Sequence, residues 1–209
     1  MFRKIALVAL LAASASAAQA QTGLRAEAQI GWDHPSAAVL ASDSTGSVNV
    51  SDGKDGFSFG GEIGYDLPAG PAILGVYANL SGATTRECVE VYGGDEACVK
   101  AGRSINAGVR AGVHLSEGVL LYVKGGYSSG RIRLSYRDPA DPTYDFRLAD
   151  NSDGYHVGGG VEVDVTRNVY AKLDYVRTNY DDLDYRDGTF GVRVRPHRDA
   201  IVYGMGIRF

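Results

Sequence analysis

The sequence has few of the residues that interrupt or anchor ordinary folds. Its 209 residues include 6 prolines, 2 cysteines, 2 methionines and 1 tryptophan. Basic residues (21) do not outnumber acidic ones (25), so the formal charge of −4 excludes the basic surface that nucleic-acid binding requires. After the first twenty residues no apolar run is long enough for a transmembrane helix, which needs about 20 residues. Glycine and tyrosine, in contrast, are abundant, with 28 and 13 residues.

The first twenty residues have the pattern of a bacterial export signal. A short positive region precedes the apolar run 5–13, and Ala18-Gln19-Ala20 supplies an A-x-A cleavage site. The apolar run is too short to span a bilayer, and the absence of a cysteine after the cleavage site excludes a lipoprotein signal. We therefore predict a cleaved Sec signal peptide at 1–20 and a mature domain at 21–209.

Export also bears on the two cysteines, Cys88 and Cys98, which are close together in the sequence. In an oxidising compartment such a pair predicts a disulfide that closes a short loop. A metal site is the alternative, but two cysteines without a nearby histidine make a poor ligand set. We expect the disulfide, and no metal or cofactor.

Most of the remaining chain alternates apolar and polar residues with period two, the pattern of a β-strand whose faces meet different environments. In the second such segment, Phe57, Phe59 and Ile63 share one face, and Ser58 and Glu62 share the other. Most segments are about ten residues or longer, the length that crosses a bilayer at a tilt of roughly 45°. The eight segments are 22–33, 55–67, 72–81, 101–115, 119–136, 151–165, 169–180 and 198–209.

The connections between these segments are alternately short and long. A soluble sandwich has no reason to sort its loops in this way, whereas a membrane barrel has short periplasmic turns and long external loops. Hydrocarbon offers the backbone no hydrogen-bond partner, so every N–H and C=O group that crosses it must be paired within the protein. Strands meet this requirement only as a closed sheet. We predict an all-β fold, an eight-stranded antiparallel up-and-down transmembrane barrel with both ends in the periplasm. The short turns are 68–71, 116–118 and 166–168, and the long connections are about 34–54, 82–100, 137–150 and 181–197.

The inward face of this barrel carries charges of both signs. An eight-stranded barrel is just wide enough for side chains to fill it, and unpaired buried charge is costly. We therefore interpret the inward charges as a structural network of ion pairs and hydrogen bonds, with a constriction lining a small pore as the alternative. The predicted network consists of Arg25, Glu27, Glu62, Arg110, Lys124, Glu162, Lys172, Asp174 and Arg208.

The abundant glycines and tyrosines fit the same architecture. Inward glycines make room for long side chains in a narrow lumen. Tyrosines are enriched where a barrel meets the membrane interface. We assign most of the 13 tyrosines to such girdles, including Tyr65, Tyr127, Tyr155 and Tyr175.

The last strand ends on an aromatic residue after a run of outward apolar side chains: Tyr203, Met205, Ile207 and Phe209. With the strands YVKGGY (122–127), YHVGGGVEV (155–163) and VYAKLDYVRTNY (169–180), it makes the chain resemble the small outer-membrane β-barrels of Gram-negative bacteria. These are the opacity-protein and OmpA-like transmembrane domains, often labelled porin family. The resemblance implies that the barrel-assembly machinery reads the terminal residues, and that outer-membrane lipid and lipopolysaccharide surround the protein.

Three functions are compatible with such a barrel. We expect a structural or surface-interaction protein, monomeric, whose long external loops leave room for an unidentified ligand. A small porin-like diffusion channel is the alternative. A lipid A-modifying enzyme is less favoured, because it needs a serine and a histidine facing lipid near the outer leaflet. His114 and His156 fall on the lumen face and His34 and His197 in loops, so none pairs convincingly with a serine there. We therefore do not expect an enzyme.

Overall fold

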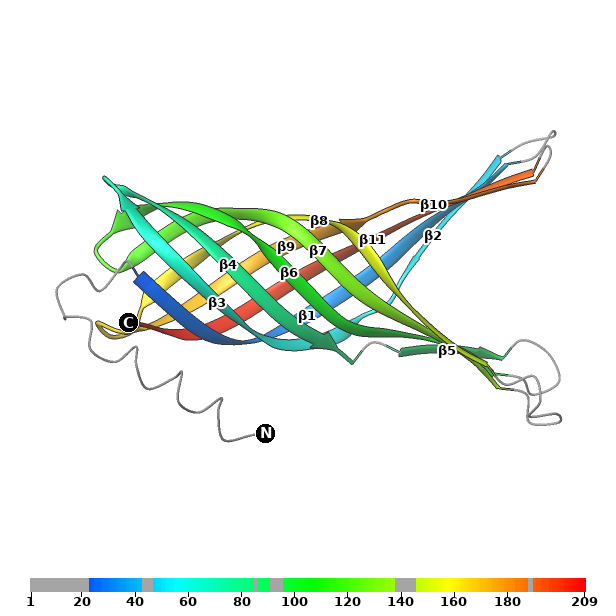
Figure 1. The fold of residues 1–209 in the computed structure, drawn as a ribbon, viewed down its shortest axis with the longest axis horizontal. Helices are drawn as coiled ribbons and strands as arrows, with labels where there is room; N and C mark the ends of the chain where they lie inside the picture. The colour runs from blue at the N-terminus through cyan, green and yellow to red at the C-terminus, as the bar shows by residue number, and fades with distance from the viewer. Residues whose placement is uncertain (1–22, 43–46, 85, 91–95, 138–145, 188–189) are drawn as a thin grey trace.

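The computed structural model describes residues 23–42, 47–84, 86–90, 96–137, 146–187 and 190–209 (Figure 1). The predicted signal peptide lies outside these residues and stays a prediction. Within them the chain forms eleven β-strands of one sheet. No helix in this part of the chain is long and apolar enough to cross a membrane.

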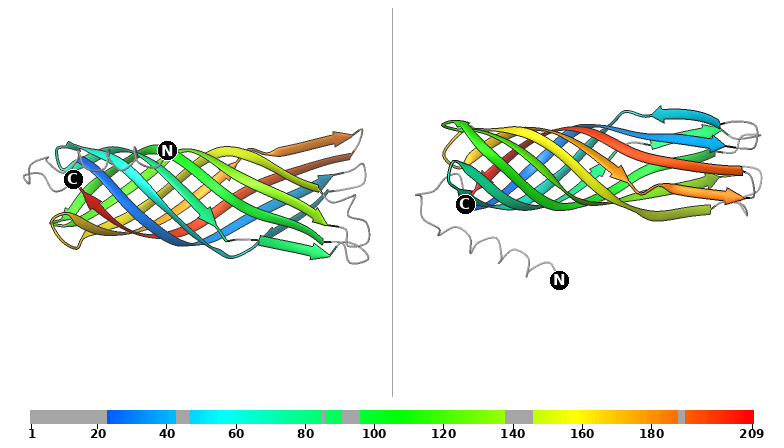
Figure 2. Two further views of the ribbon diagram at one scale, coloured as in Figure 1. Left: turned by 60° about the horizontal axis from the view of Figure 1, so that its bottom comes forward. Right: turned by 90° about the horizontal axis from the view of Figure 1, so that it is seen from above.

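Eight long strands close into an antiparallel barrel (Figures 1 and 2). Each pairs with the next barrel strand along the chain, and the last pairs back with the first, so the barrel itself has no open edge. The predicted eight-stranded up-and-down barrel is confirmed. Its strands are β1 (Gly23–Ser42), β3 (Gly56–Ala69), β4 (Ala72–Ala83), β6 (Glu96–Ser116), β7 (Val119–Arg137), β8 (Phe146–Asp164), β9 (Val169–Tyr180) and β11 (Phe190–Arg208).

The three short turns and the chain's C-terminus gather at one end of the barrel (Figure 1). Gly70 and Gly118 have φ angles of 67° and 78°, a left-handed conformation that glycine adopts without steric cost. In the third turn, the hydroxyl of Thr166 accepts hydrogen bonds from the backbone N–H groups of Asn168 and Val169. We call this the short-turn end, the periplasmic side of a membrane barrel.

The opposite end differs from the long loops that the sequence predicts. Three further strands form there, and barrel strands run on beyond the barrel. Extended pairing satisfies backbone groups that a loop would leave to water. Short alternating stretches such as 47–51, 183–186 and 190–195 were the available signal. The added strands are β2 (Ser47–Gly53), β5 (Arg86–Glu90) and β10 (Leu183–Asp187).

These extensions make two four-stranded sheets. The first arm, as we call it, has the order β2–β1–β11–β10, and the second arm has the order β5–β6–β7–β8. Figures 1 and 2 show both arms projecting from the barrel at the end opposite the short turns. The second arm contains the predicted disulfide, because Cys88 of β5 and Cys98 of β6 face each other directly in the strand ladder and are bonded.

The two faces of the barrel wall differ in chemistry. Charged side chains that point inward are buried, whereas large apolar side chains on the same strands are exposed outward. An exposed apolar band of this kind suits contact with lipid and not with water. The outward residues include Ile30, Phe57, Ile63, Val76, Val109, Val123, Val157, Leu173 and Ile201, together with the four predicted girdle tyrosines.

Arginine substitutions at two depths test whether lipid covers this band. Val109, 62% exposed, stands in the middle of the barrel wall, and Leu115, 61% exposed, stands beside a short turn. We expect V109R to lower the free energy of unfolding in vesicles by about 2–4 kcal/mol and L115R by about 0–1 kcal/mol, because arginine is most costly at the bilayer midplane. Urea titration followed by the fluorescence of Trp32, the single tryptophan, measures both. Equal effects at the two depths would contradict a lipid-covered band.

Candidate functional site

The interior of the barrel holds a continuous network of ion pairs. At the short-turn end, Arg208 of β11 pairs with Glu162 and Asp164 of β8. Glu162 also accepts a hydrogen bond from Arg110 of β6, over 2.9 Å between Nη1 and Oε2. Arg110 makes a second, two-pronged contact with Asp66 of β3, and its Nε lies 2.9 Å from Asp66 Oδ1. One guanidinium thus ties β3 to β8 across the lumen.

Arg25 of β1 joins this group to the middle of the lumen. Its Nε lies 3.4 Å from Asp66 Oδ2, the carboxylate that Arg110 also contacts. Its Nη2 donates to Glu62 at 2.8 Å, and its Nη1 lies 3.3 Å from Glu27. Arg25 therefore bridges three carboxylates, which no single strand could bring together.

Two lysines complete the network. Lys124 of β7 lies 3.0 Å from Glu62 and 3.1 Å from Asp174. Lys172 of β9 lies 3.0 Å from Asp174 and also pairs with Glu27. Lys124 therefore contacts two carboxylates, and Lys172 contacts three, because its ammonium also lies 3.7 Å from Glu62. Buried charge requires such partners.

Three tyrosines reinforce these pairs from inside the lumen. The hydroxyl of Tyr170 donates to Glu27 at 2.7 Å, and that of Tyr122 donates to Asp174. Tyr77 bonds to His156, and its ring lies 4.7 Å from the ammonium of Lys124. These three tyrosines do not belong to an interfacial girdle. A tyrosine side chain suits both the lumen and the membrane interface. Only its inward or outward position in the alternation of the strand distinguishes the two.

All nine charged residues that were predicted for the lumen have buried side chains. The predicted network left out Asp66, which stands close to a short turn but is 2% exposed and joins two arginines. It also left out Asp33, which pairs with Arg198. Both aspartates stand at alternate positions that point inward on their strands, and this placement was available from the sequence.

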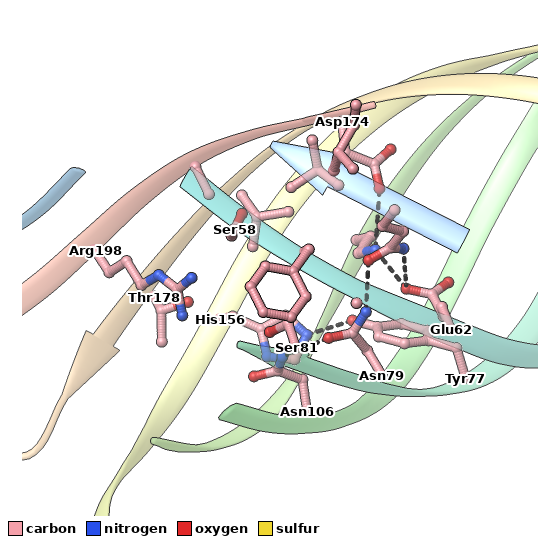
Figure 3. Close-up of a pocket in the computed structure, with 18 residues that line it drawn as sticks. Ser58, Glu62, Tyr77, Asn79, Ser81, Asn106, His156, Asp174, Thr178 and Arg198 are labelled. Atoms are coloured by element: carbon pink, nitrogen blue, oxygen red, sulfur yellow. Dashed lines mark hydrogen bonds and ion pairs between the residues drawn. The ribbon is translucent and has the colours of Figure 1, made fainter. Parts of the chain in front are cut away.

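A polar cavity of about 60 Å³ lies above the network, on the side of the arms. Glu62 and Asp174 line it near the network, and amide side chains line its wall (Figure 3). Asn106 donates to Asn79 at 3.0 Å, and Asn79 donates to Gln29 at 2.6 Å. A polar space of this size is large enough to hold water molecules.

The residues of the predicted assembly signal lie on the closing strand of the barrel. Tyr203, Met205, Ile207 and Phe209 all point outward and are exposed. Their strand, β11, pairs with β1 on one side and with β9 on the other. Recognition of these residues by the assembly machinery stays a prediction.

One histidine is central to the polar wall of the lumen. The Nδ1 atom of His156 lies 2.7 Å from the hydroxyl of Ser128, and its Nε2 atom bonds to Tyr77. Among the described residues, no group of three or more histidines, cysteines and acidic residues is placed to hold a metal ion.

The other histidines correct an expectation. His34 and His197 stand on β1 and β11 and not in loops. On the outside of the barrel, Nδ1 of His34 lies 2.7 Å from Oδ1 of Asp55, and Ser36 lies two residues further along the same strand. His34 and Ser36 thus share the outward face of β1, and the expectation that no histidine pairs with a serine at the outward boundary stays a prediction. The acid partner, Asp55, is distant in sequence and gave no signal.

A family model of the outer membrane protein beta-barrel domain matches residues 5–195. The chain belongs to the outer membrane protein beta-barrel domain family. Its place is accordingly the bacterial outer membrane, as the resemblance implied. A curated member of similar size, a 22 kDa outer membrane protein of Rhizobium leguminosarum bv. viciae, is 29% identical over 173 residues, which cover 78% of this chain and 74% of the relative.

Solved outer-membrane barrels resemble this family member more distantly. Ail, the attachment invasion locus protein of Yersinia pestis, is 14% identical, with 90% of this chain and 100% of that chain covered and a TM-score of 0.43. Neisserial surface protein A is 19% identical, with coverage of 86% and 97% and a TM-score of 0.43. The outer membrane protease OmpT of Escherichia coli is 10% identical, with coverage of 90% and 97% and a TM-score of 0.49. Likenesses of this degree carry no argument about function.

Removal of one buried arginine tests whether the network stabilises the outer-membrane barrel. We expect R110A to lower the free energy of unfolding by about 3–5 kcal/mol, because Asp66 and Glu162 would lose a buried partner. The matched control is R195A, since Arg195 pairs with Asp182 at 3.2 Å with both side chains largely exposed. It should cost less than about 1 kcal/mol. Urea titration in vesicles measures both, and equal costs would argue against a stabilising network.

Proposed function

We propose that this outer-membrane barrel is a non-conducting structural and surface-interaction protein. The closure of its lumen carries the proposal. Arg25, Arg110 and Lys172 each contact carboxylates contributed by more than one strand, and all three side chains are buried. A hydrated ion could pass only if several of these pairs separated, and breaking a buried pair leaves an uncompensated charge.

The two arms support the interaction part of the proposal. They extend the barrel wall into regular sheets, so this end of the molecule presents an ordered surface and not merely connecting loops. Within the described residues, β2, β5 and β10 each pair with one neighbouring strand. Strand edges of this kind offer backbone groups to a partner. The Cys88–Cys98 disulfide supports the second arm by fixing β5 to β6.

A small diffusion channel is the alternative, and the polar cavity above the network favours it. Its wall of asparagine, serine and threonine side chains would suit a hydrated entrance. Conduction would still require a path through the charged residues below. The two functions therefore differ in whether the network opens.

Planar-bilayer recording separates the two functions. We expect the refolded wild-type protein to give no stable unit conductance, because the ion pairs occupy the lumen across its width. Heat-modifiable mobility on gels shows that each sample contains folded barrel. Glu62→Gln is the companion variant, since it keeps the shape of a side chain that contacts both Arg25 and Lys124. Stable conductance steps in the wild type that change size in E62Q would overturn the proposal in favour of the channel.

A further inference from the structure

The outward face of the first arm brings together a histidine, a serine and an aspartate. His34 and Ser36 are two residues apart on β1, so they share the outward face of that strand. Asp55 lies in the short bend between β2 and β3. Its Oδ1 atom is 2.7 Å from Nδ1 of His34. The hydrogen bond to Asp55 engages Nδ1, so Nε2 is the ring nitrogen that would act as the base.

That second nitrogen shares a small space with the hydroxyl of Ser36. Gly53 stands opposite Ser36 in the β1–β2 ladder. A Cβ atom on Gly53 would lie 2.5 Å from Ser36 Oγ and 2.6 Å from His34 Nε2. A side chain at position 53 would therefore collide with both atoms, so the ends of Ser36 and His34 lie close together over the glycine, although no hydrogen bond joins them. Serine hydrolases use the same three groups, with the acid orienting the histidine and the histidine activating the serine. Their catalytic hydrogen bonds are often long until substrate binds.

The imidazole is held from two further directions. The ring of Trp32 stacks on His34 with centroids 5.5 Å apart and an angle of 19° between the planes. The backbone N–H of Lys54 donates to the carbonyl of Pro35 at 3.1 Å, which fastens the bend that carries Asp55 to β1. Orientation of the base by a carboxylate and a stacked ring is what such a site requires.

The place of these residues on the outer wall of the barrel indicates which kind of substrate they could reach. Trp32 and Phe57 are paired neighbours on β1 and β3, both exposed outward, directly next to His34 on the barrel side. Aromatic residues at this place mark the interface between hydrocarbon and headgroups. Because the site is on the arm side and faces outward, it meets the outer leaflet at the depth where acyl chains join their headgroups.

A cation lies in the same row of the outer wall. His34 pairs in register with Asp199 of β11, which pairs in turn with Arg177 of β9. The guanidinium of Arg177 is 46% exposed and lies 3.8 Å from the carboxylate of Asp199. A half-exposed arginine at this level suits the phosphate of a lipid headgroup.

We propose that Ser36, His34 and Asp55 form a hydrolase site for acyl esters of outer-leaflet lipids. In the first step, Ser36 Oγ attacks the ester carbonyl carbon while His34 Nε2 takes the hydroxyl proton. Asp55 holds the Nδ1 proton and stabilises the imidazolium. The bond to the alcohol oxygen then breaks, that oxygen receives the proton from His34, and the acyl group remains on Ser36.

Water completes the reaction. His34 takes a proton from a water molecule as the water oxygen attacks the acyl carbon, and the proton passes to Ser36 Oγ as its bond to the acyl group breaks. One ester and one water thus yield one alcohol and one fatty acid, with no other reactant. The site lies outside the lumen, so this activity does not depend on whether the barrel conducts.

The lumen contains a second serine–histidine pair that lacks these properties. Ser128 and His156 are buried, and the remaining nitrogen of His156 is bonded to Tyr77 and not to a carboxylate. A lipid ester has no access to it. Ser128 is therefore the matched control for Ser36.

The test uses the refolded full-length protein and three ester probes. These are p-nitrophenyl palmitate in mixed micelles, vesicles of phosphatidylethanolamine, and purified lipopolysaccharide, with released fatty acid measured by mass spectrometry. We expect the wild type to release fatty acid, Ser36→Ala to abolish the release, and His34→Asn to slow it about a hundredfold or more, the range of a lost general base. Ser128→Ala should leave the rate unchanged.

Two further measurements separate catalysis from folding. Gly53→Ala places a methyl group between Ser36 and His34, so it should abolish hydrolysis while heat-modifiable mobility shows an intact barrel. A fluorophosphonate reagent should label Ser36 in the wild type and fail to label it in His34→Asn. Release from lipopolysaccharide alone, from phospholipid alone or from both supports the proposal and identifies the lipid. No release from either lipid, release that persists in Ser36→Ala, or labelling of another serine would overturn it.

Discussion

The pairing of buried charges is the constraint on which this barrel depends. The five cations of the network occupy a lumen too narrow to hydrate them, so each must contact carboxylates from neighbouring or facing strands. Arg25 and Arg110 meet at Asp66, and this meeting requires β1, β3 and β6 to keep one mutual register. A slip of one residue in any of these strands would turn its charged side chains toward lipid.

The same register determines the outer surface and the spacing of small residues. The residues that point away from the lumen form the apolar band, so one alternating pattern suits both the lipid outside and the polar lumen inside. Glycines let the network fit: a Cβ atom on Gly160 would lie 2.0 Å from Oδ1 of Asp174, a member of the network. The filled lumen leaves the arms and the outer wall as the places where this protein can meet other molecules.

Access distinguishes the two serine–histidine pairs. Ser128 and His156 serve as hydrogen-bonding side chains in the polar wall of the lumen. His34 bonds to an aspartate through Nδ1, its Nε2 atom lies near the hydroxyl of Ser36 over Gly53, and the residue stands on the outward face of β1. The chemistry of similar residue types therefore follows from the face of the strand and its depth, and the fold controls both.

Period-two alternation determined the eight barrel strands and the face on which Arg110, Glu62 or Val109 lies, because the alternation is local and lipid and lumen demand opposite polarity. The alternately short and long connections determined the antiparallel order. Neither pattern could determine which charges pair. Asp66 meets Arg110 and Arg25, and Asp55 meets His34, only through strand register and closure, which combine residues distant in the chain. The arms were also decided by tertiary structure, since alternating stretches as short as 47–51 and 183–186 do not show which strand they pair with. Only the folded barrel brought Gly53 and Asp55 beside Ser36 and His34, because cross-strand neighbours have no fixed spacing in sequence.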